Sequence, residues 1–507
     1  METLYSYSYI GILFSILLWD LMNAKKISTS FAKGLFFSSL LLYSISFFVS
    51  GEGFFRKMAF VLPRDVGIAV AVVFASHYLV KNIKTFAVAV LCLFVATKFF
   101  YFGVLQQTFV TNTVTVKVDP NAELLFDIKN ETQLAEIKKA LAKYNPEITK
   151  AFPELRYKGY SELDDYYLVN VADNYTDKLD EVIKTLFDTD AVDWAERNEI
   201  IKLGPPVKGE TKAYDKISAC VNDPLVPKQW AFKKMNMCEF YDSLDKLRPK
   251  KKAKIAILDT GVDSNHEDLN NNYISTEKRY DRDNNGHGTH CAGIAGAVTN
   301  NKGGVASFSP GDNKFTRVTS VKVLSDYGGG TQFSIIRGMI QAVDSGADVL
   351  SLSLGGPSDD EKQKAYEEVV KYAGKAGAIV VVAAGNSDQN AKNYMPAGAK
   401  GVIAVSAVDS ELGKAHFSNY ISDLEMGIAG PGVDIISTFP KNEYMALNGT
   451  SMAAPHVAGI VGIMKAVRPN LTAKQAFKIL EKSGIKTKNT EQTGMFIQPN
   501  KVLDELK

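Results

Sequence analysis

IAILDTGVD, at residues 255–263, begins with a short apolar run that ends in an aspartate, Asp259. Comparable runs of Val, Ile, Leu and Ala recur along the chain, and stretches with helical spacing separate them. Near-continuous apolar strands that alternate with helices are typical of a parallel sheet with helices on both faces. Residues 223–507 are therefore predicted to form an α/β domain with a doubly wound, mainly parallel sheet. The other runs are VTSVKVL at 318–324, ADVLSLSL at 347–354, AIVVVAA at 378–384 and GVIAVSA at 401–407.

Asp259 lies where an open parallel sheet presents its site residues, at the carboxyl end of a strand. The triplet DTG at 259–261 also has a second interpretation, because aspartic proteases use such a triplet twice. The other candidate, DSG at 344–346, follows the helical run FSIIRGMIQAV and precedes a strand. It is predicted to be a turn between helix and strand, so a pair of catalytic aspartates is not favoured.

NNGHGTHCAG, at residues 284–293, contains two histidines three positions apart, His287 and His290. The helix of a zinc protease needs a spacing of four with a glutamate between the histidines, so a metal pair is not favoured. Small residues fill the rest of the segment and predict a helix that packs tightly against its neighbours. They are Gly288, Ala292, Gly293, Ala295 and Gly296.

NGTSMAAPHVAGIVGIMKAV, at residues 448–467, predicts a helix with Ser451 in its first turn. A serine at the start of a helix is usually a cap. Here the neighbouring Gly and Ala residues leave the face of Ser451 open. The exposed amides and the positive end of the helix also favour a developing oxyanion. Both interpretations, a cap and a reactive serine, fit this position.

In the order Asp, His, Ser, these three segments resemble the signature of the subtilisin family. The resemblance covers residues 223–507 and implies a serine endopeptidase with an acyl-enzyme intermediate. It assigns Ser451 as the nucleophile and His287, the first histidine of HGTH, as the general base and then acid. It assigns Asp259 to orient the imidazole and to stabilise its charged form. His290 is left with a structural role.

The resemblance also covers the groups that bind substrate. In VVVAAGNSD, Asn386 follows a glycine, where an asparagine is ordinarily a turn residue. The resemblance makes it a donor to the oxyanion, together with the amide of Ser451. Two Gly-rich segments match those that hold an extended peptide between them as added strands, although taken alone they fit flexible loops. Their residues are Gly328, Gly329, Gly330, Ser353, Leu354, Gly355 and Gly356.

Calcium is the ion that the resemblance implies. Asp268 in NHEDL and Asn301 in TNNKGGV match ligand positions of a calcium site in the family, and Asp223 resembles an N-terminal ligand. Oxygen ligands of this kind suit Ca²⁺. The alternative is that these are three solvated loop residues.

The chain has four cysteines, too few for a disulfide scaffold in 507 residues. Cys92 lies in an apolar run and Cys291 lies beside the proposed site. Cys220 and Cys238 are therefore the pair that could form a disulfide. The sequence does not fix the cellular compartment, so whether they pair stays open.

Residues 1–110 are predicted to be an α-helical transmembrane domain of about four spans. Three spans, a cleaved signal peptide or buried core helices are the alternatives. A signal peptide carries its positive charge ahead of one apolar stretch, whereas Lys25 and Lys26 follow the first stretch here. The positive charges of the short loops favour a multi-pass protein with both termini, and hence the catalytic domain, outside the cytoplasm. The apolar stretches run from Tyr5 to Met22, Phe31 to Ser50, Val66 to Val80 and Thr85 to Gln106.

Residues 111–203 are predicted to form a small α+β unit that ends in DAVDWAERNEIIKL. The element order resembles the ferredoxin-like propeptide of subtilisin-type proteases, which assists folding and inhibits the enzyme. Another accessory domain of the same fold is the alternative. The polar residues 204–222, with Pro205 and Pro206, are predicted to be a linker that contains a processing site. The predicted strands are Thr113–Val118, Tyr166–Val171 and Val192–Ile201, and the predicted helices are Glu131–Tyr144 and Thr176–Phe187.

The charge distribution argues against nucleic acid as a partner. Residues 1–110 carry 9 Lys/Arg and 4 Asp/Glu, which leaves 49 basic and 52 acidic residues for the rest of the chain. The soluble part therefore has no basic excess to neutralise phosphates. Protein or peptide substrates, the chain's own propeptide and the lipid bilayer are the expected partners. The rival functions are a catalytically silent, membrane-bound peptide-binding module and a transporter or sensor with an accessory protease domain.

Overall fold

The computed structural model of the chain describes residues 15, 22, 32–33, 35–40, 123–204, 207–213, 220–311, 314–358 and 364–506. The chain divides into two compact units, Met1–Val114 and Thr115–Lys507. The few described residues of the first unit are helical. Otherwise the predicted transmembrane domain, with its spans from Tyr5 to Gln106, lies outside the described residues. In the described part of the chain, one helix, Thr450–Val467, is long and apolar enough to cross a bilayer, and all of it is buried in the second unit.

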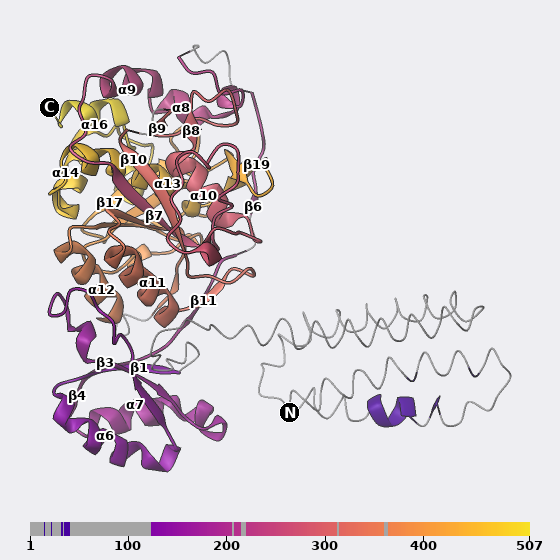
Figure 1. Ribbon diagram of the computed structural model, residues 1–507, viewed down its shortest axis with the longest axis vertical. Coiled ribbons are helices and arrows are strands. Elements are labelled where there is room, and N and C mark those ends of the chain that lie inside the picture. Colours follow the sequence, from indigo (N-terminus) through magenta and orange to yellow (C-terminus); the bar gives the residue numbers. More distant parts are fainter. Residues whose placement is uncertain are drawn as a thin grey trace. The chain divides into compact units, whose positions relative to one another are not determined.

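A six-stranded, fully parallel sheet lies at the centre of the second unit (Figure 1). Its order is β10-β7-β12-β14-β16-β17, so the chain leaves β7 first toward one edge and then toward the other. The prediction of an α/β fold with a mainly parallel sheet is confirmed, since each quoted apolar run overlaps one of these strands. The strands are β7 (Ala253–Asp259), β10 (Thr316–Lys322), β12 (Val349–Leu352), β14 (Ile379–Ala383), β16 (Ile403–Val408) and β17 (Gly427–Pro431).

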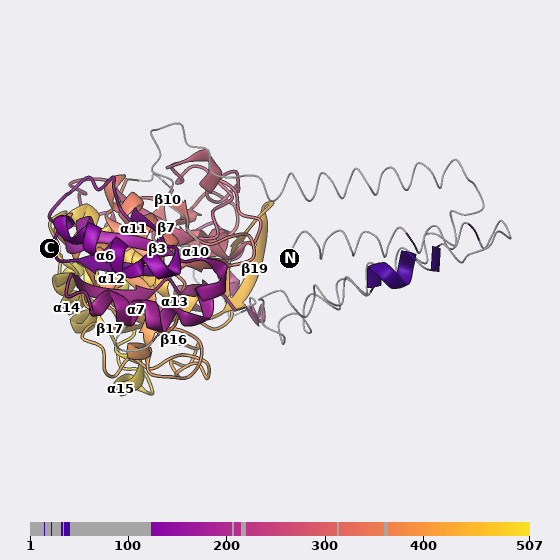
Figure 2. The same cartoon turned by 90° about the horizontal axis from the view of Figure 1, so that it is seen from below.

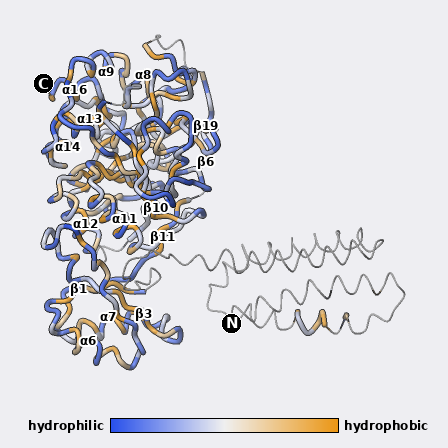
Figure 3. The backbone as a smooth tube through the Cα atoms, in the orientation of Figure 1, coloured by the Kyte–Doolittle hydropathy of each residue, from blue (hydrophilic) through white to orange (hydrophobic). Residues whose placement is uncertain are grey.

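Alternate side chains of β7 enter two hydrophobic layers, one on each face of the sheet. Ile255 and Ile257 pack in the layer that contains α10 and α13, whereas Ala256 and Leu258 pack in the layer that contains α11 and α12. Figure 3 shows hydrophobic segments in the interior of this unit and hydrophilic ones at its periphery. The helices are α10 (His287–Gly296), α11 (Gln332–Asp344), α12 (Lys364–Lys375) and α13 (Thr450–Val467).

Residues 123–197 form a small domain with a four-stranded antiparallel sheet in the order β2-β3-β1-β4. One face of this sheet carries α6 and α7. The other face packs on α11 and α12, because Leu125, Tyr166 and Leu168 share their apolar cluster (Figures 1 and 2). The elements are β1 (Leu124–Ile128), α6 (Leu134–Leu141), β2 (Glu147–Lys150), β3 (Tyr166–Asn170), α7 (Leu179–Phe187) and β4 (Val192–Arg197).

Most of the elements predicted for this domain are confirmed. The helix predicted at Glu131–Tyr144 is α6 with a 3-10 turn at each end, and the one predicted at Thr176–Phe187 is a 3-10 helix followed by α7. The last predicted strand divides into β4 and β5 (Ile200–Lys202). The strand predicted at Thr113–Val118 lies outside the described residues. The sequence analysis missed β1 and β2, because Asp127 interrupts the first and the second has one apolar residue.

Shorter elements complete the second unit. The part of this unit from Cys220 onward, which contains the parallel sheet, is called the large domain. A disulfide joins Cys220 to Cys238. The pair that the sequence left open is therefore bonded, and it ties the beginning of the large domain to α9. The remaining strands are β6 (Val207–Lys208), β8 (Val298–Thr299), β9 (Ser309–Pro310), β11 (Gly329–Thr331), β13 (Gly356–Pro357), β15 (Tyr394–Met395), β18 (Ile435–Phe439) and β19 (Glu443–Asn448). The remaining helices are α8 (Trp230–Lys234), α9 (Met237–Leu244), α14 (Ala473–Ser483), α15 (Thr490–Thr493) and α16 (Pro499–Asp504).

Candidate active site

Asp259 and His287 meet at the carboxyl end of the central sheet. Asp259 is the last residue of β7, from which the chain runs toward both edges, and His287 is the first residue of α10. Such a switch point is where open α/β sheets bind ligands. The Nδ1 atom of His287 lies 2.9 Å from each carboxylate oxygen of Asp259, which is fully buried. Burial alone lowers the pKa of His287, but the negative charge of Asp259 and the hydrogen bond to it outweigh burial, so this pKa lies well above its ordinary value of 6.5.

The start of α10 lies directly against the chain that follows β7. A Cβ atom at Gly288 would lie 2.1 Å from the carbonyl oxygen of Gly261, so only a hydrogen fits there. The amide of Gly288 donates to Oγ1 of Thr260 at 3.0 Å. Glycine is therefore required at this position for the close approach of His287 to Asp259. This contact explains why the sequence has small residues in this segment.

Ser451 lies in the first turn of α13, close to His287. Gly449, which precedes the helix, has a φ of +155°, a conformation that residues with side chains rarely adopt. The Ser451 hydroxyl donates to the carbonyl oxygen of Ser353 at 3.0 Å, and the Ser353 hydroxyl donates to the carbonyl oxygen of Ser451 at 2.7 Å. The thiol of Cys291 connects the two helices, since it donates to the Ser451 carbonyl at 3.4 Å and lies 4.0 Å from Nδ1 of His287.

Asn386 and the amide of Ser451 both lie close to Gly449. Oδ1 of Asn386 accepts the amide and the hydroxyl of Thr450, each at 2.8 Å. These two bonds fix the orientation of the side-chain amide and leave Nδ2 free to donate. A Cβ atom at Gly449 would lie 3.5 Å from this Nδ2 and 3.6 Å from the nitrogen of Ser451. A pair of N–H donors near one position is the kind of arrangement that suits an oxygen that becomes negative.

The first predicted substrate segment, Gly328–Gly330, is paired with residues of the same chain. β11 pairs antiparallel with β5, with Gly330 opposite Ile201, and the amide of Leu203 donates to the carbonyl of Gly328 at 2.8 Å. The side chain of Ile201 is 3% exposed. The segment Gly328–Gly330 is therefore paired with an extended strand that has a buried aliphatic side chain.

The second predicted segment, Ser353–Gly356, connects the neighbourhood of Ser451 with that of Ile201. Ser353 contacts Ser451 through both its carbonyl and its hydroxyl. Leu354 is buried, and a Cβ atom at Gly356 would lie 3.1 Å from Cδ1 of Ile201. Gly356 pairs with Met395, and a Cβ atom at Gly355 would lie 2.9 Å from the Met395 carbonyl. The structure thus brings both predicted segments together around Ile201.

A strand that the sequence analysis missed lies on the other side of Ser451. β6 belongs to the predicted linker 204–222, yet it pairs with β19, with Val207 opposite Asn448. The amide of Gly209 extends this pairing to the carbonyl of Ala446 at 2.9 Å. Asn448 precedes Ser451 by three residues, so β6 pairs with the chain just ahead of Ser451, whereas β5 pairs with β11. A two-residue strand in a polar segment carries no pattern from which it could be predicted.

The three predicted calcium residues lie together beside the loop after β8. Asp268 is fully buried and accepts Nδ2 of Asn301 at 2.7 Å and the amide of Val305 at 2.8 Å. Asp223 accepts the amide of Asn301 at 3.3 Å. Burial raises the pKa of Asp268 to about 7, and the charges of Asp223 and Glu267 add to this effect. Buried oxygen donors under negative potential fit a hard cation such as Ca²⁺ in their chemistry.

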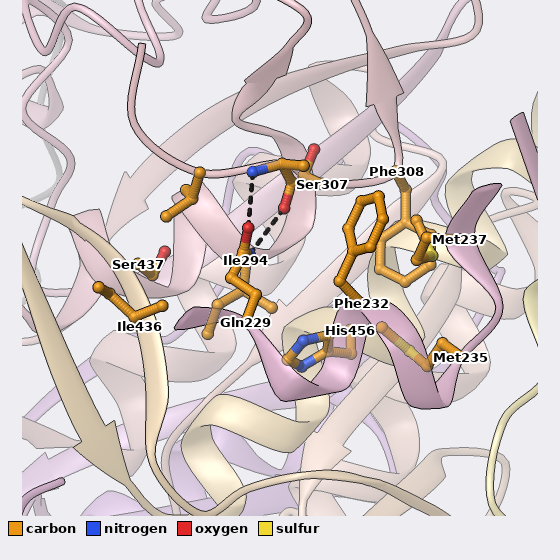
Figure 4. Close-up of a pocket in the computed structure, with 13 residues that line it drawn as sticks. Gln229, Phe232, Met235, Met237, Ile294, Ser307, Phe308, Ile436, Ser437 and His456 are labelled. Atoms are coloured by element: carbon orange, nitrogen blue, oxygen red, sulfur yellow. Dashed lines mark hydrogen bonds between the residues drawn. The ribbon is translucent and has the colours of Figure 1, made fainter. Parts of the chain in front are cut away.

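His290 and the pocket shown in Figure 4 lie outside the site. His290 is buried, its Nε2 lies 2.9 Å from the carbonyl oxygen of Met445, and burial lowers its pKa to about 3. The pocket lies between the α8–α9 segment, α10 and α13, and Gln229 closes one side through two 2.9 Å hydrogen bonds with the backbone of Ala306 (Figure 4). None of the three residues Asp259, His287 and Ser451 lines this pocket.

Known proteins match the large domain. Residues 250–498 match the sequence profile of the Subtilase family. Thermitase of Thermoactinomyces vulgaris is 45% identical over 217 residues, which are 42% of this chain and 74% of thermitase. Subtilisin DY of Bacillus licheniformis is 42% identical over 231 residues, 44% of this chain and 80% of that protein. A solved structure of a protease from Pseudoalteromonas arctica is 28% identical, covers 57% of this chain and all of its own, and has a TM-score of 0.49. The chain belongs to the subtilase family of serine proteases, and it is a serine endopeptidase.

Proposed function

We propose that Asp259, His287 and Ser451 are the catalytic triad that cleaves peptide bonds. The observation that carries this proposal is the 2.9 Å contact of His287 Nδ1 with both oxygens of Asp259, on the helix that packs against α13, which has Ser451 in its first turn. This contact leaves Nε2 of His287 to accept the Ser451 proton as the hydroxyl oxygen attacks the substrate carbonyl. Asp259 then stabilises the imidazolium. In the described structure the hydroxyl is bonded to Ser353, and catalytic hydrogen bonds commonly form only when substrate is bound.

The negative oxygen of the tetrahedral intermediate is held by Asn386 Nδ2 and by the amide of Ser451. The intermediate collapses when His287 gives its proton to the leaving amine, which leaves an acyl-enzyme on Ser451. Water then attacks this ester, gives a proton to His287, and the acid product leaves as the Ser451 hydroxyl is restored. The substrate is an extended protein segment that pairs with Gly328–Gly330 and Ser353–Gly356.

The test compares peptide hydrolysis by Ser451→Ala, His287→Ala and a matched control, His416→Ala. His416 is an exposed histidine far along the chain from the triad. The first two variants should fold and lose hydrolysis, whereas the control should keep it. Near-wild-type turnover by His287→Ala would mean that the base is misassigned.

We also propose that residues 111–203 are a ferredoxin-like propeptide that inhibits the protease. The pairing of β5 with β11 supports this, because β5 lies where the strand of a peptide substrate would pair with the enzyme. The small domain also contributes to the start of α11, where Asn198 accepts the amide of Phe333 at 2.9 Å and Glu196 accepts Nε2 of Gln332 at 3.0 Å. Self-processing would cut the chain between Leu203 and Asn222. Adding purified residues 115–203 to the mature enzyme should inhibit it, and full activity at saturating concentrations would exclude the proposal.

Two further proposals concern localisation and calcium. Residues 1–110 would be a multi-pass membrane anchor, with the protease domain outside the cytoplasm; the apolar stretches and the disulfide at Cys220–Cys238 support this. Fractionation of full-length Ser451→Ala into the soluble phase would contradict it.

Ca²⁺ would bind at Asp223, Asp268 and Asn301 and stabilise the fold without entering the chemistry.

A further inference from the structure

Asp283 is a buried carboxylate beside the triad that the proposed mechanism does not use. It is 5% exposed and accepts five hydrogen bonds. Oδ1 accepts the hydroxyl of Thr260 at 2.9 Å and the amides of Asn285 and Gly286 at 3.0 and 2.9 Å. Oδ2 accepts the amide of Thr289 at 2.9 Å and its hydroxyl at 2.7 Å. A buried carboxylate with this many donors is held in one orientation and fixes every group that it contacts.

One role of Asp283 is to cap α10. The residue that precedes this helix is Gly286, which has no side chain to accept the free amides of the first turn. Asp283 accepts the amide of Thr289, and Asn285 Oδ1 accepts the amide of His287 at 3.3 Å. A negative charge at this end of a helix is stabilised by the helix dipole. The first turn, which begins with His287, therefore depends on Asp283 for its position.

Asp283 also connects this turn to the chain that carries Asp259. The hydroxyl of Thr260 donates to Asp283 and accepts the amide of Gly288 at 3.0 Å. Thr260 follows Asp259 in the chain, and Gly288 follows His287. Asp259 and His287 are thus each one peptide unit away from a group in the same hydrogen-bond network. Such coupled buried networks hold their members more rigidly than the separate bonds would.

We infer that Asp283 is a positioning residue of the protease, which sets the distance and orientation of His287 against Asp259. This inference rests on the proposed triad. Asp283 touches neither the reacting atoms nor the peptide strand β5, so its removal should affect turnover and leave substrate binding in place. It should also affect the titration of His287. Burial lowers the pKa of His287, whereas the charge of Asp259, the neighbouring Cys291 and the hydrogen bond to Asp259 raise it, and the contact with Asp259 is the part of this balance that Asp283 sets. Burial raises the pKa of the Cys291 thiol and lowers that of His290.

The test is Asp283→Asn in the full chain, purified in detergent and matured like the wild type. Asparagine keeps one acceptor but places an NH2 group against the amide of Thr289. Active sites are titrated with a fluorophosphonate, and kcat, KM and the pH profile are measured on a chromogenic peptide. We expect kcat per titrated site to fall roughly 10- to 100-fold, the range for a small misplacement of catalytic groups. KM should stay within about twofold, and the acid limb of the profile should move to lower pH, because the contact with Asp259 raises the His287 pKa.

Asp281→Asn is the matched control, since Asp281 accepts the hydroxyl of Tyr273 at 2.7 Å and lies outside the network. A second pair of variants keeps the inference testable if Asp283→Asn does not fold. Thr260→Val removes the hydroxyl at similar volume and should lower kcat, whereas Thr260→Ser restores the hydroxyl and should recover most of the loss. The double variant Asp283→Asn/Thr260→Val should cost less than the product of the two single losses, as expected within one network.

The inference is overturned if Asp283→Asn lowers only the melting temperature while kcat per titrated site and the acid limb match the wild type. The same holds if Thr260→Val and Thr260→Ser behave alike. Failure of the proposed triad gives a different result, because hydrolysis would then persist in Ser451→Ala. The two proposals are thereby separated.

Discussion

Replacing Asn386 with alanine should reduce turnover and leave substrate affinity and folding nearly unchanged. Nδ2 of Asn386 and the amide nitrogen of Ser451 both lie near Gly449, and the proposal makes them the two donors to the oxyanion. The negative oxygen exists in the transition state and not in the bound substrate, so the loss falls on kcat. Removing one such donor from a subtilisin lowers kcat by about 10²–10³, or about 2.7–4 kcal/mol. Because Asn386 is exposed, its truncation leaves no cavity.

One structural detail complicates the size of this effect. Oδ1 of Asn386 also accepts the amide and hydroxyl of Thr450, each at 2.8 Å, so alanine also removes two bonds at the start of α13. Thr450→Val serves as the control, because it removes one of these bonds and keeps Nδ2. Steady-state hydrolysis of a peptide anilide, with active sites titrated, should show a loss at least tenfold smaller for Thr450→Val than for Asn386→Ala. A kcat for Asn386→Ala within about threefold of wild type would refute the oxyanion assignment.

Three other outcomes follow from the structure. First, kcat/KM should be lost as pH falls through the raised pKa of His287, because the base must be neutral, and the midpoint should lie above 6.5. Asp259→Asn should move this midpoint to lower pH. A midpoint near 5 in the wild type would contradict the assignment. Second, chelating calcium should lower the melting temperature by roughly 5–10 °C without changing kcat at 25 °C. This shift corresponds to the loss of about 2.7 kcal/mol of stabilisation, the value for a hundredfold excess of ion over Kd. Asp268→Asn should show no response to the chelator, and an unchanged wild-type melting temperature would count against the site. Third, membranes that express the wild type should release a soluble protease cut between Leu203 and Asn222, whereas Ser451→Ala should remain one full-length membrane band; release of both variants would assign the cut to another protease.

The sequence was sufficient for the sheet, which leaves a local pattern, and it led to a triad that stays a prediction. Apolar runs separated by helical spacing predicted the strands, and the carboxyl-edge rule placed Asp259 correctly. The resemblance then supplied the roles of His287 and Ser451, which the motifs alone had left open. Asn386 and the two substrate segments were proposed in the same way. The structure places Asn386 and Ser353 at the start of α13 and brings both segments to Ile201, while their roles stay predictions.

Long-range contacts explain what the sequence analysis missed. β6 has two residues and lies in a segment predicted to be a linker. Its partner strand β19 is more than 200 positions further along the chain. Asp283 looks like an ordinary loop aspartate in DRDNNG, and its five hydrogen bonds appear only when β7 and α10 are brought together. Asp283 lies three residues ahead of Gly286, a glycine at the position where a helix usually has a capping side chain. This was the one local signal, and the sequence analysis did not use it.

The most direct test of the central claim is to locate the covalent adduct of a fluorophosphonate on the active, matured enzyme. Peptide mass spectrometry should find the adduct on the fragment that contains Ser451, with labelling absent in Ser451→Ala and much slower in His287→Ala, because the hydroxyl needs its base. An adduct on another serine, or equal labelling of wild type and Ser451→Ala, would contradict the assignment of Asp259, His287 and Ser451 as the catalytic triad.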